Sequence, residues 1–176
     1  MFQIVHREPT PNPNAFKFRT GNALVDGGHQ LNFASSEGAE KFAPARELFK
    51  LDGVTAVMIA DDFVSVSAST GSDWDEIEGV LQRELENYSR ADATRLAEEQ
   101  AAAAVESKAS REGDDLFQKV DQILTDYVRP ALEGDGGGIE LVDVADSVVT
   151  IRYQGACGSC PTSTANTLAA IENLLK

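Results

Sequence analysis

The sequence has little cysteine: Cys157 and Cys160 are the only two among 176 residues. It also has few basic groups, with 15 Lys and Arg against 29 Asp and Glu and a formal net charge of −14. The acidic groups are spread along the chain without any basic cluster, so we expect no nucleic-acid partner. No apolar run approaches the about 20 residues that cross a bilayer, so we expect no membrane segment.

The first residues carry no recognisable targeting signal. Residues 1–8 contain neither a basic stretch followed by an apolar one nor an Arg- and Ser-rich leader that is poor in acidic groups. We therefore expect a cytoplasmic protein in a reducing environment. In that setting a pair of cysteines indicates metal binding or redox chemistry rather than a structural disulfide.

Residues 1–88 have the pattern of a small α+β domain. Prolines alternate with polar residues over residues 9–14, which predicts an extended loop. Apolar and basic residues alternate over residues 15–19, which predicts a half-buried strand. A helix is expected from Ser36, which would cap it, to about Lys50.

The rest of this domain is predicted to be a β-hairpin followed by a helix. Residues 54–59 and 63–67 form the hairpin, and the helix runs from near Asp73 to residue 88. In the second strand, valines alternate with serines, so we expect the two types to lie on opposite faces: Val64 and Val66 on one, Ser65 and Ser67 on the other.

Residues 89–113 change character and are predicted to be a linker. Residues 91–109 are rich in Ala, Glu, Arg and Gln and have almost no large apolar side chain. High helix propensity without an apolar stripe predicts a solvated helix or a semi-rigid spacer that is not part of a core. The predicted fold class is therefore two small α+β domains joined by an Ala/Glu-rich helical linker.

The second domain, residues 114–176, starts with an amphipathic helix that we expect to end near Pro130. A glycine-rich turn follows over residues 133–138. Residues 139–144 and 148–153 predict two strands, and after the cysteines a helix opens at Pro161. Its predicted inward face consists of Thr164, Leu168, Ile171 and Leu175.

The two cysteines lie in a glycine-containing loop at the start of this last helix. Helix-terminal N–H groups and the helix dipole favour the thiolate, the form that binds metal and attacks disulfides. Structural zinc and iron–sulfur clusters commonly take four protein ligands, and this chain offers two. His6 and His29 belong to the other domain, and we interpret them as surface or structural residues. A symmetric dimer, with Cys157 and Cys160 from each protomer, would complete the site.

Other interpretations of the cysteine pair remain open. A Cys-x-x-Cys at a helix start also suits a dithiol–disulfide redox protein, although such proteins usually present it from a βαβ unit rather than after a hairpin. A zinc-bridged structural dimer is a third possibility, and a pair of incidental surface thiols is the simplest.

Several motifs then point to one family. In the second domain they are Val128-Arg129-Pro130 with Leu132, Asp135-Gly136-Gly137, Ile139-Glu140-Leu141-Val142, Gln154-Gly155-Ala156-Cys157 and Cys160-Pro161. In the first they are Thr10-Pro11-Asn12-Pro13-Asn14-Ala15, Lys17-Phe18, Leu48-Phe49, Gly53-Val54 and Asp73-Trp74. Residues 116–176 thereby resemble the NifU-like domain of the Nfu family of iron–sulfur carriers, and residues 8–88 resemble the N-terminal domain of that family.

This resemblance implies a scaffold or carrier, not an enzyme. It would accept a [4Fe-4S] cluster from an upstream donor and deliver it to apo-proteins. Cys157 and Cys160 would bind the cluster and its iron in a homodimer. We further expect backbone N–H groups of Ala156, Gly158 and Ser159 to donate to cluster sulfur. The N-terminal domain would recognise clients or the donor.

The sequence departs from the family pattern in two places. Gly158 and Ser159 stand between the cysteines, where the family often has a small polar residue and then Gly, so we expect the loop geometry to be retained. Gly138 stands where the family usually has a second Asp.

Overall fold

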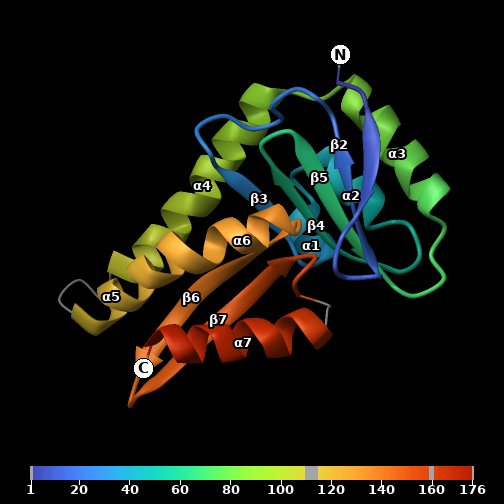
Figure 1. The fold of residues 1–176 in the computed structure, drawn as a ribbon. Helices are drawn as coiled ribbons and strands as arrows, with labels where there is room; N and C mark the ends of the chain where they lie inside the picture. Colours follow the sequence, from blue (N-terminus) through green and yellow to red (C-terminus); the bar gives the residue numbers. More distant parts are fainter. Residues whose placement is uncertain (1, 110–114, 159–160, 176) are drawn as a thin grey trace.

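The structure is a computed structural model that describes residues 2–109, 115–158 and 161–175. It contains a five-stranded sheet and a two-stranded sheet, each with its own helices (Figure 1). The mixed α+β content confirms the predicted fold class, and the predicted domain boundaries at residues 88 and 114 stay predictions.

The larger sheet is antiparallel, with strand order β1-β2-β5-β4-β3. Its strands are β1 (His6–Pro9), β2 (Ala15–Arg19), β3 (Gln30–Phe33), β4 (Val54–Ala60) and β5 (Phe63–Ala68). The predicted strand over residues 15–19 and the predicted hairpin are confirmed. The edge strands β1 and β3 were not predicted, because both are only four residues long and β1 is polar and ends in a proline.

The predicted helix over residues 36–50 is divided in two. Helix α1 (Ser36–Ala39) is capped by Ser35 rather than by Ser36, and α2 (Ala43–Leu48) begins anew with Pro44 in its first turn. Proline has no N–H to donate and its ring would clash with the preceding turn, so it starts a helix instead of continuing one.

Helix α3 (Trp74–Glu86) confirms the second predicted helix of this domain. The Asp73 side chain caps it by accepting hydrogen bonds from the backbone nitrogens of Asp75 and Glu76, at 3.0 and 3.1 Å. Its fully buried face joins the core of the larger sheet with the side chains Ile77, Leu81 and Leu85.

Helix α4 (Arg90–Ala109) is present as predicted, but the expectation that it is solvated is wrong for its first half. Ala93 and Ala97 are fully buried in the core beneath the larger sheet. The side-chain amide of Gln100 accepts a hydrogen bond from Asn32 N and donates one to Asn32 O, so the helix covers the edge strand β3. The buried face of α4 was not recognisable in the sequence because it consists of alanines. The small alanine side chain adds little hydrophobicity, although it permits close packing.

The first helix of the second half does not end at Pro130 as predicted. Helix α5 (Asp115–Ile123) continues through one π-helical turn, η1 (Leu124–Val128), into α6 (Arg129–Gly134). At the end of this π-helical turn, Arg129 N donates a hydrogen bond to Leu124 O, five residues earlier. A π-type turn changes the hydrogen-bonding register just before Pro130, which has no N–H to offer.

The smaller sheet is the predicted hairpin, β6 (Gly137–Ala145) and β7 (Val148–Gly155), and α7 (Pro161–Leu175) follows it. On α7, Ile171 is buried and Leu175 half-buried as predicted, whereas Leu168 is 41% exposed. The Thr164 side chain lies outside the described residues. A hairpin of two strands needs such covering helices for stability.

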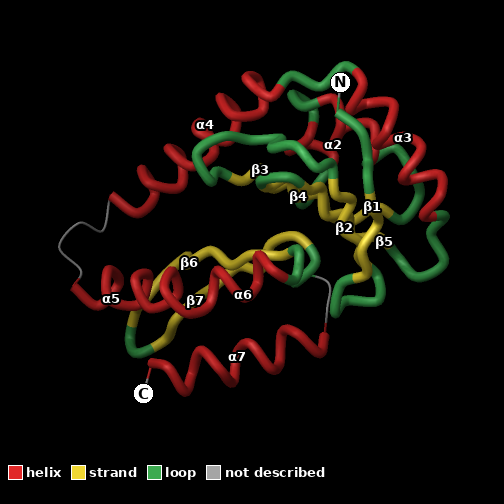
Figure 2. Tube along the Cα trace, turned by 45° about the horizontal axis from the view of Figure 1, so that its top comes forward, coloured by secondary structure: helices red, strands yellow, loops and turns green. Residues whose placement is uncertain are grey.

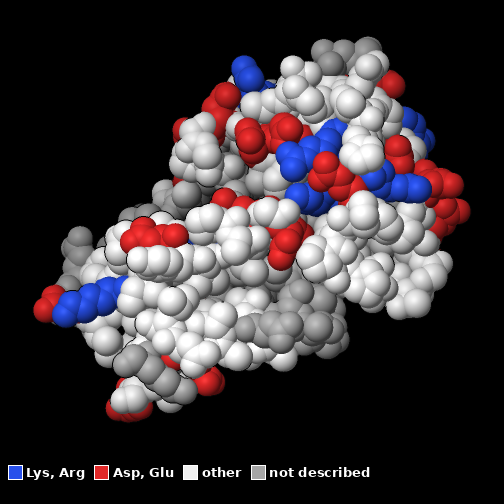
Figure 3. Space-filling view, viewed as in Figure 1, with Lys and Arg blue, Asp and Glu red and all other residues white. Residues whose placement is uncertain are grey.

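The two sheets and their helices are arranged in layers. Figure 2 shows α2, α3 and α4 on one side of the larger sheet and the β6–β7 hairpin with α6 and α7 on the other. In Figure 3, basic side chains on the larger-sheet unit are interleaved with acidic ones, so this face shows no broad basic patch. Among the described residues, no helix has the length and apolarity to cross a membrane.

Candidate functional site

Cys157 lies two residues after the end of β7, at the junction between the two halves of the molecule. Its side chain is only 3% exposed and belongs to the core of the second domain. Cys160 lies outside the described residues, and α7 begins directly after it at Pro161. The predicted strand–loop–helix context of the cysteine pair is therefore present, but Cys157 is buried rather than displayed on the surface.

A glycine provides the space that Cys157 occupies. A Cβ atom on Gly137 would overlap the Cys157 sulfur and would lie 2.8 Å from the Cys157 backbone nitrogen. Gly137 pairs with Gly155 at the open end of the β6–β7 hairpin, so both strands approach the cysteine without side chains. The glycine-rich turn thus gives room for the thiol.

Gly155 meets two requirements at the end of β7. Its φ of +57° lies in the left-handed region, which favours glycine. A Cβ atom here would also lie 2.7 Å from Gly136 O and 3.1 Å from the Met58 sulfur on β4. The strand end is therefore pressed against the larger sheet, and any larger residue would move it.

The backbone N–H groups around Cys157 already have partners. Ala156 N donates to Gly136 O at 3.1 Å, and Gly158 N donates to Gly155 O at 3.2 Å. In this conformation the two groups hold the loop closed, and the expectation that they donate to cluster sulfur stays a prediction. Ser159 lies outside the described residues.

Three side chains of the first domain hold the loops that surround Cys157. Asn12 Nδ2 donates to Ala156 O at 2.7 Å, and Ser67 Oγ donates to Gly155 O at 3.4 Å. Lys17 Nζ donates to Gly134 O at 2.6 Å. Sequence reasoning did not assign these residues to the site, although Asn12 and Lys17 occur in motifs that it identified.

Tyr153 is a further side chain near the cysteine. Burial raises the pKa of its phenol, and the charge of Cys157 raises it further, while a hydrogen bond with Thr167 acts in the opposite direction. The phenol therefore stays neutral at physiological pH and contributes no charge beside the thiol.

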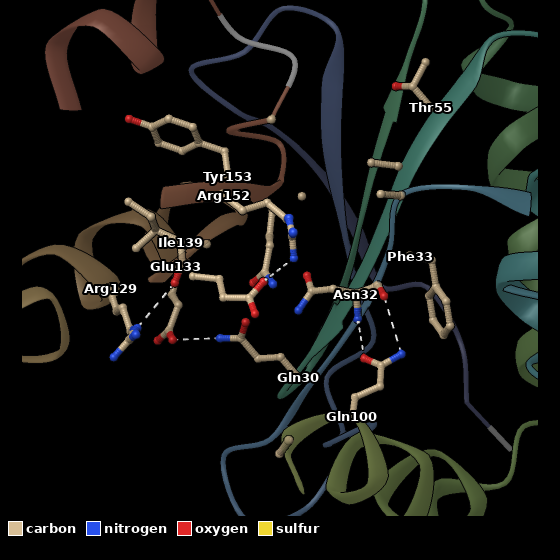
Figure 4. Close-up of a pocket in the computed structure, with 18 residues that line it drawn as sticks. Gln30, Asn32, Phe33, Thr55, Gln100, Arg129, Glu133, Ile139, Arg152 and Tyr153 are labelled. Carbon is tan, nitrogen blue, oxygen red and sulfur yellow. Dashed lines mark hydrogen bonds and ion pairs between the residues drawn. The ribbon is translucent and has the colours of Figure 1, made fainter. Parts of the chain in front are cut away.

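A cavity of about 720 Å³ lies beside the cysteine loop, between the two domains. Figure 4 shows Gln30, Asn32 and Gln100 on its first-domain side and Arg129 and Glu133 on the other. Gln30 Nε2 donates to Glu133 Oε1 across it at 2.7 Å. Within the described ranges, no cluster of three or more His, Cys, Asp or Glu side chains is arranged to hold a metal ion.

Comparisons with known proteins give a family match for each half of the chain. Residues 5–92 match the family described as "Scaffold protein Nfu/NifU N terminal", and residues 120–176 match the "NifU-like domain". The two matches occur in the order that the sequence motifs predicted, with Cys157 and Cys160 inside the second.

Relatives resemble the chain along nearly its whole length. NifU-like protein 4, mitochondrial, of Arabidopsis thaliana is 29% identical over 98% of this chain and 61% of its own length. The human NFU1 iron-sulfur cluster scaffold homolog, mitochondrial, is 26% identical over 99% of this chain and 68% of its own length. The chain thus spans between 61% and 68% of the length of these two relatives. It belongs to the Nfu/NifU family of iron–sulfur cluster scaffold proteins.

Proposed function

We propose that this chain accepts a [4Fe-4S] cluster on Cys157 and Cys160, holds it between two protomers and passes it to apo-proteins. The observation that carries the proposal is the position of the cysteine pair. It follows β7 and directly precedes α7, within the region that matches the NifU-like domain. The chain has only these two cysteines, and a four-iron cluster commonly takes four thiolates, so a second protomer would supply the other two.

Delivery is ligand exchange in this proposal, not catalysis. Thiolates of a client replace those of Cys157 and Cys160 one at a time, and no bond of a substrate is cleaved. A cluster shared between two copies has little protein around it, which suits transfer better than permanent electron carriage. We further propose that the first domain recognises clients or the upstream donor. The expected reducing cytosol stays a prediction.

The test is anaerobic reconstitution of the full chain with ferrous iron and sulfide. We expect a brown protein with about four iron and four sulfide per two chains. Cys157→Ser and Cys160→Ser should each lose both the colour and the dimer, whereas Thr150→Ser, exposed on β7, should keep both. The loaded protein should activate an apo-enzyme that needs such a cluster.

Each alternative predicts a different result in the same experiment. A dithiol–disulfide redox protein would stay colourless and would reduce a disulfide substrate as a monomer. A zinc-bridged dimer would be colourless with a stoichiometric zinc content. Either result would contradict the proposed carrier function.

A further inference from the structure

The face of the larger sheet that turns away from its helices carries buried polar side chains beside the apolar cluster of Met58, Ala60 and Phe63. Lys17 on β2 and Ser65 and Ser67 on β5 are 5%, 0% and 0% exposed, respectively. Alternation with the buried valines of β5 predicts that the serines face water in a domain standing alone. They are buried because the loops beside Cys157 lie directly on them.

This contact consists of side chains that bind backbone carbonyl groups. Asn12, Ser67 and Lys17 donate to the backbone carbonyl groups of residues 156, 155 and 134, respectively. These acceptors lie on both sides of the space that Cys157 occupies. Asn12 is itself fixed, because Asn14 N donates to its Oδ1 at 3.0 Å and the Thr10 hydroxyl donates to its carbonyl at 2.9 Å. The proline-rich loop therefore presents a preformed donor to the peptide next to Cys157.

Glycine makes this close approach possible on the other side. Gly136 has a φ of +78°, and a Cβ atom there would lie 2.8 Å from the Lys17 side chain and 3.1 Å from Ser65 Oγ. The glycine-rich turn thus permits the close contact between the domains and also leaves space for Cys157.

Two features favour a contact that opens. Ser65 Oγ is buried without a hydrogen-bond partner in the described part of the chain, which disfavours the closed arrangement because water would satisfy it. The cavity beside the loop, crossed by the hydrogen bond from Gln30 to Glu133, leaves part of the boundary between the domains unpacked. Polar, incompletely packed boundaries between domains permit relative motion.

We propose that the polar face formed by Asn12, Lys17, Ser65 and Ser67 is a docking surface for the cysteine loop of its own chain, and that docking competes with cluster binding. Cys157 is buried within the apolar cluster of its own domain, and the peptide that must move to turn its thiol toward a second protomer is the one that Asn12 holds. Loading therefore requires undocking. The second half of this inference rests on the proposed function, whereas the first half concerns the cluster-free protein alone.

The test measures how fast Cys157 reacts with N-ethylmaleimide in the reduced, metal-free full chain, with peptide mass spectrometry to separate it from Cys160. In Ser67→Arg, the long side chain would hold the domains apart. We expect Cys157 to react about tenfold faster than in the wild type, as after the loss of one or two interface hydrogen bonds. Ser69→Arg, exposed just beyond the same strand, is the matched control and should react at the wild-type rate.

A folded Ser67→Arg protein that reacts at the wild-type rate would overturn the docking proposal. Should this variant fail to fold, Asn12→Ala removes the bond to Ala156 O without added bulk, and Asn22→Ala, exposed in a turn, is its control. We then expect Cys157 to react faster in Asn12→Ala than in the wild type and at the wild-type rate in Asn22→Ala. A wild-type rate in Asn12→Ala would overturn the docking proposal.

A second measurement follows cluster uptake in the same variants. Ser67→Arg should load faster than the wild type and Ser69→Arg, and equal rates would overturn the competition between docking and loading. Faster alkylation in variants that take up no iron would support docking while it contradicted the proposed function, so the two failures are distinguishable.

Discussion

Glycines shape the cysteine site more than ligating or charged side chains do. Gly137 leaves space for the Cys157 sulfur, and Gly155 lets the end of β7 approach the neighbouring sheet. The cysteine pair and the glycine-rich turn were both identifiable in the sequence, because their residue types are chemically distinctive. Their mutual contact was not, because it depends on the register in which Gly137 faces Gly155.

Gly137→Ala should destabilise the second domain. The added methyl group would overlap Cys157, and overpacking of this kind costs about 1–3 kcal/mol. Urea unfolding monitored by circular dichroism measures the loss. Gly134→Ala, three residues earlier, is the control, since a Cβ atom there meets nothing within 4 Å. Equal stability of the two variants would show that the side chain of Cys157 is not tightly packed against Gly137.

Contacts between distant residues were beyond sequence reasoning. Asn12 and Ala156 are 144 positions apart, and Lys17 and Gly134 are 117 apart. Local patterns report which face of an element is apolar, but they do not report which distant loop covers a polar face. Lys17 therefore appeared in the sequence as a solvent-facing residue of a half-buried strand.

At the scale of elements, local patterns predicted long and regular segments best. The alternating β4–β5 hairpin and the capped helix α3 were found close to their observed bounds. Errors occurred where one residue opposed the surrounding pattern. Pro44 divided the first predicted helix, whereas Pro130 failed to end a helix because a π-type turn preceded it.

Asp73→Ala should weaken the first domain through helix α3. It removes both hydrogen bonds that cap the first turn, and loss of such a cap costs about 1 kcal/mol. Chemical unfolding followed by Trp74 fluorescence measures the change. Glu86→Ala, exposed in the last turn of the same helix, should leave stability within about 0.5 kcal/mol of the wild type. An unchanged Asp73→Ala midpoint would mean that the cap contributes nothing.

Ala97→Leu tests the packing of α4 against the larger sheet. Ala97 is fully buried, so the larger side chain should cost about 1–3 kcal/mol. Ala102→Leu, exposed on the same helix, should be nearly neutral. Thermal unfolding of the two variants gives the comparison. If both leave stability unchanged, α4 is the solvated spacer that composition alone predicts.

At the scale of the whole molecule, the two halves have separate apolar cores and meet through polar contacts and through Met58 on β4, which lies beside Gly155. The apolar residues of each half form separate clusters, and hydrogen bonds from Asn12, Lys17 and Ser67 connect them. Sequence patterns predicted two compact units for this reason. The same patterns gave no sign of docking, because a serine face that binds carbonyl groups resembles one that binds water.

This arrangement predicts that Ser67→Arg uncouples the unfolding of the two halves. Trp74, the only tryptophan, lies on α3 against Phe16, with ring centroids 4.7 Å apart, and reports on the first half. Its thermal transition should stay within about 2 °C of the wild type, because Ser67→Arg lies on the opposite face of the sheet. In far-UV circular dichroism, the thermal transition of the second half should move to a lower temperature. Equal shifts of both signals would show that the halves form one cooperative unit.

The mass of the anaerobically reconstituted protein under native conditions tests directly whether the cluster lies between two protomers. We expect two chains with one four-iron cluster, and separation into single chains when a chelator removes the iron or Cys157→Ser removes a ligand. A cluster retained by a single chain, or a dimer that persists without iron, would contradict a cluster held between two protomers.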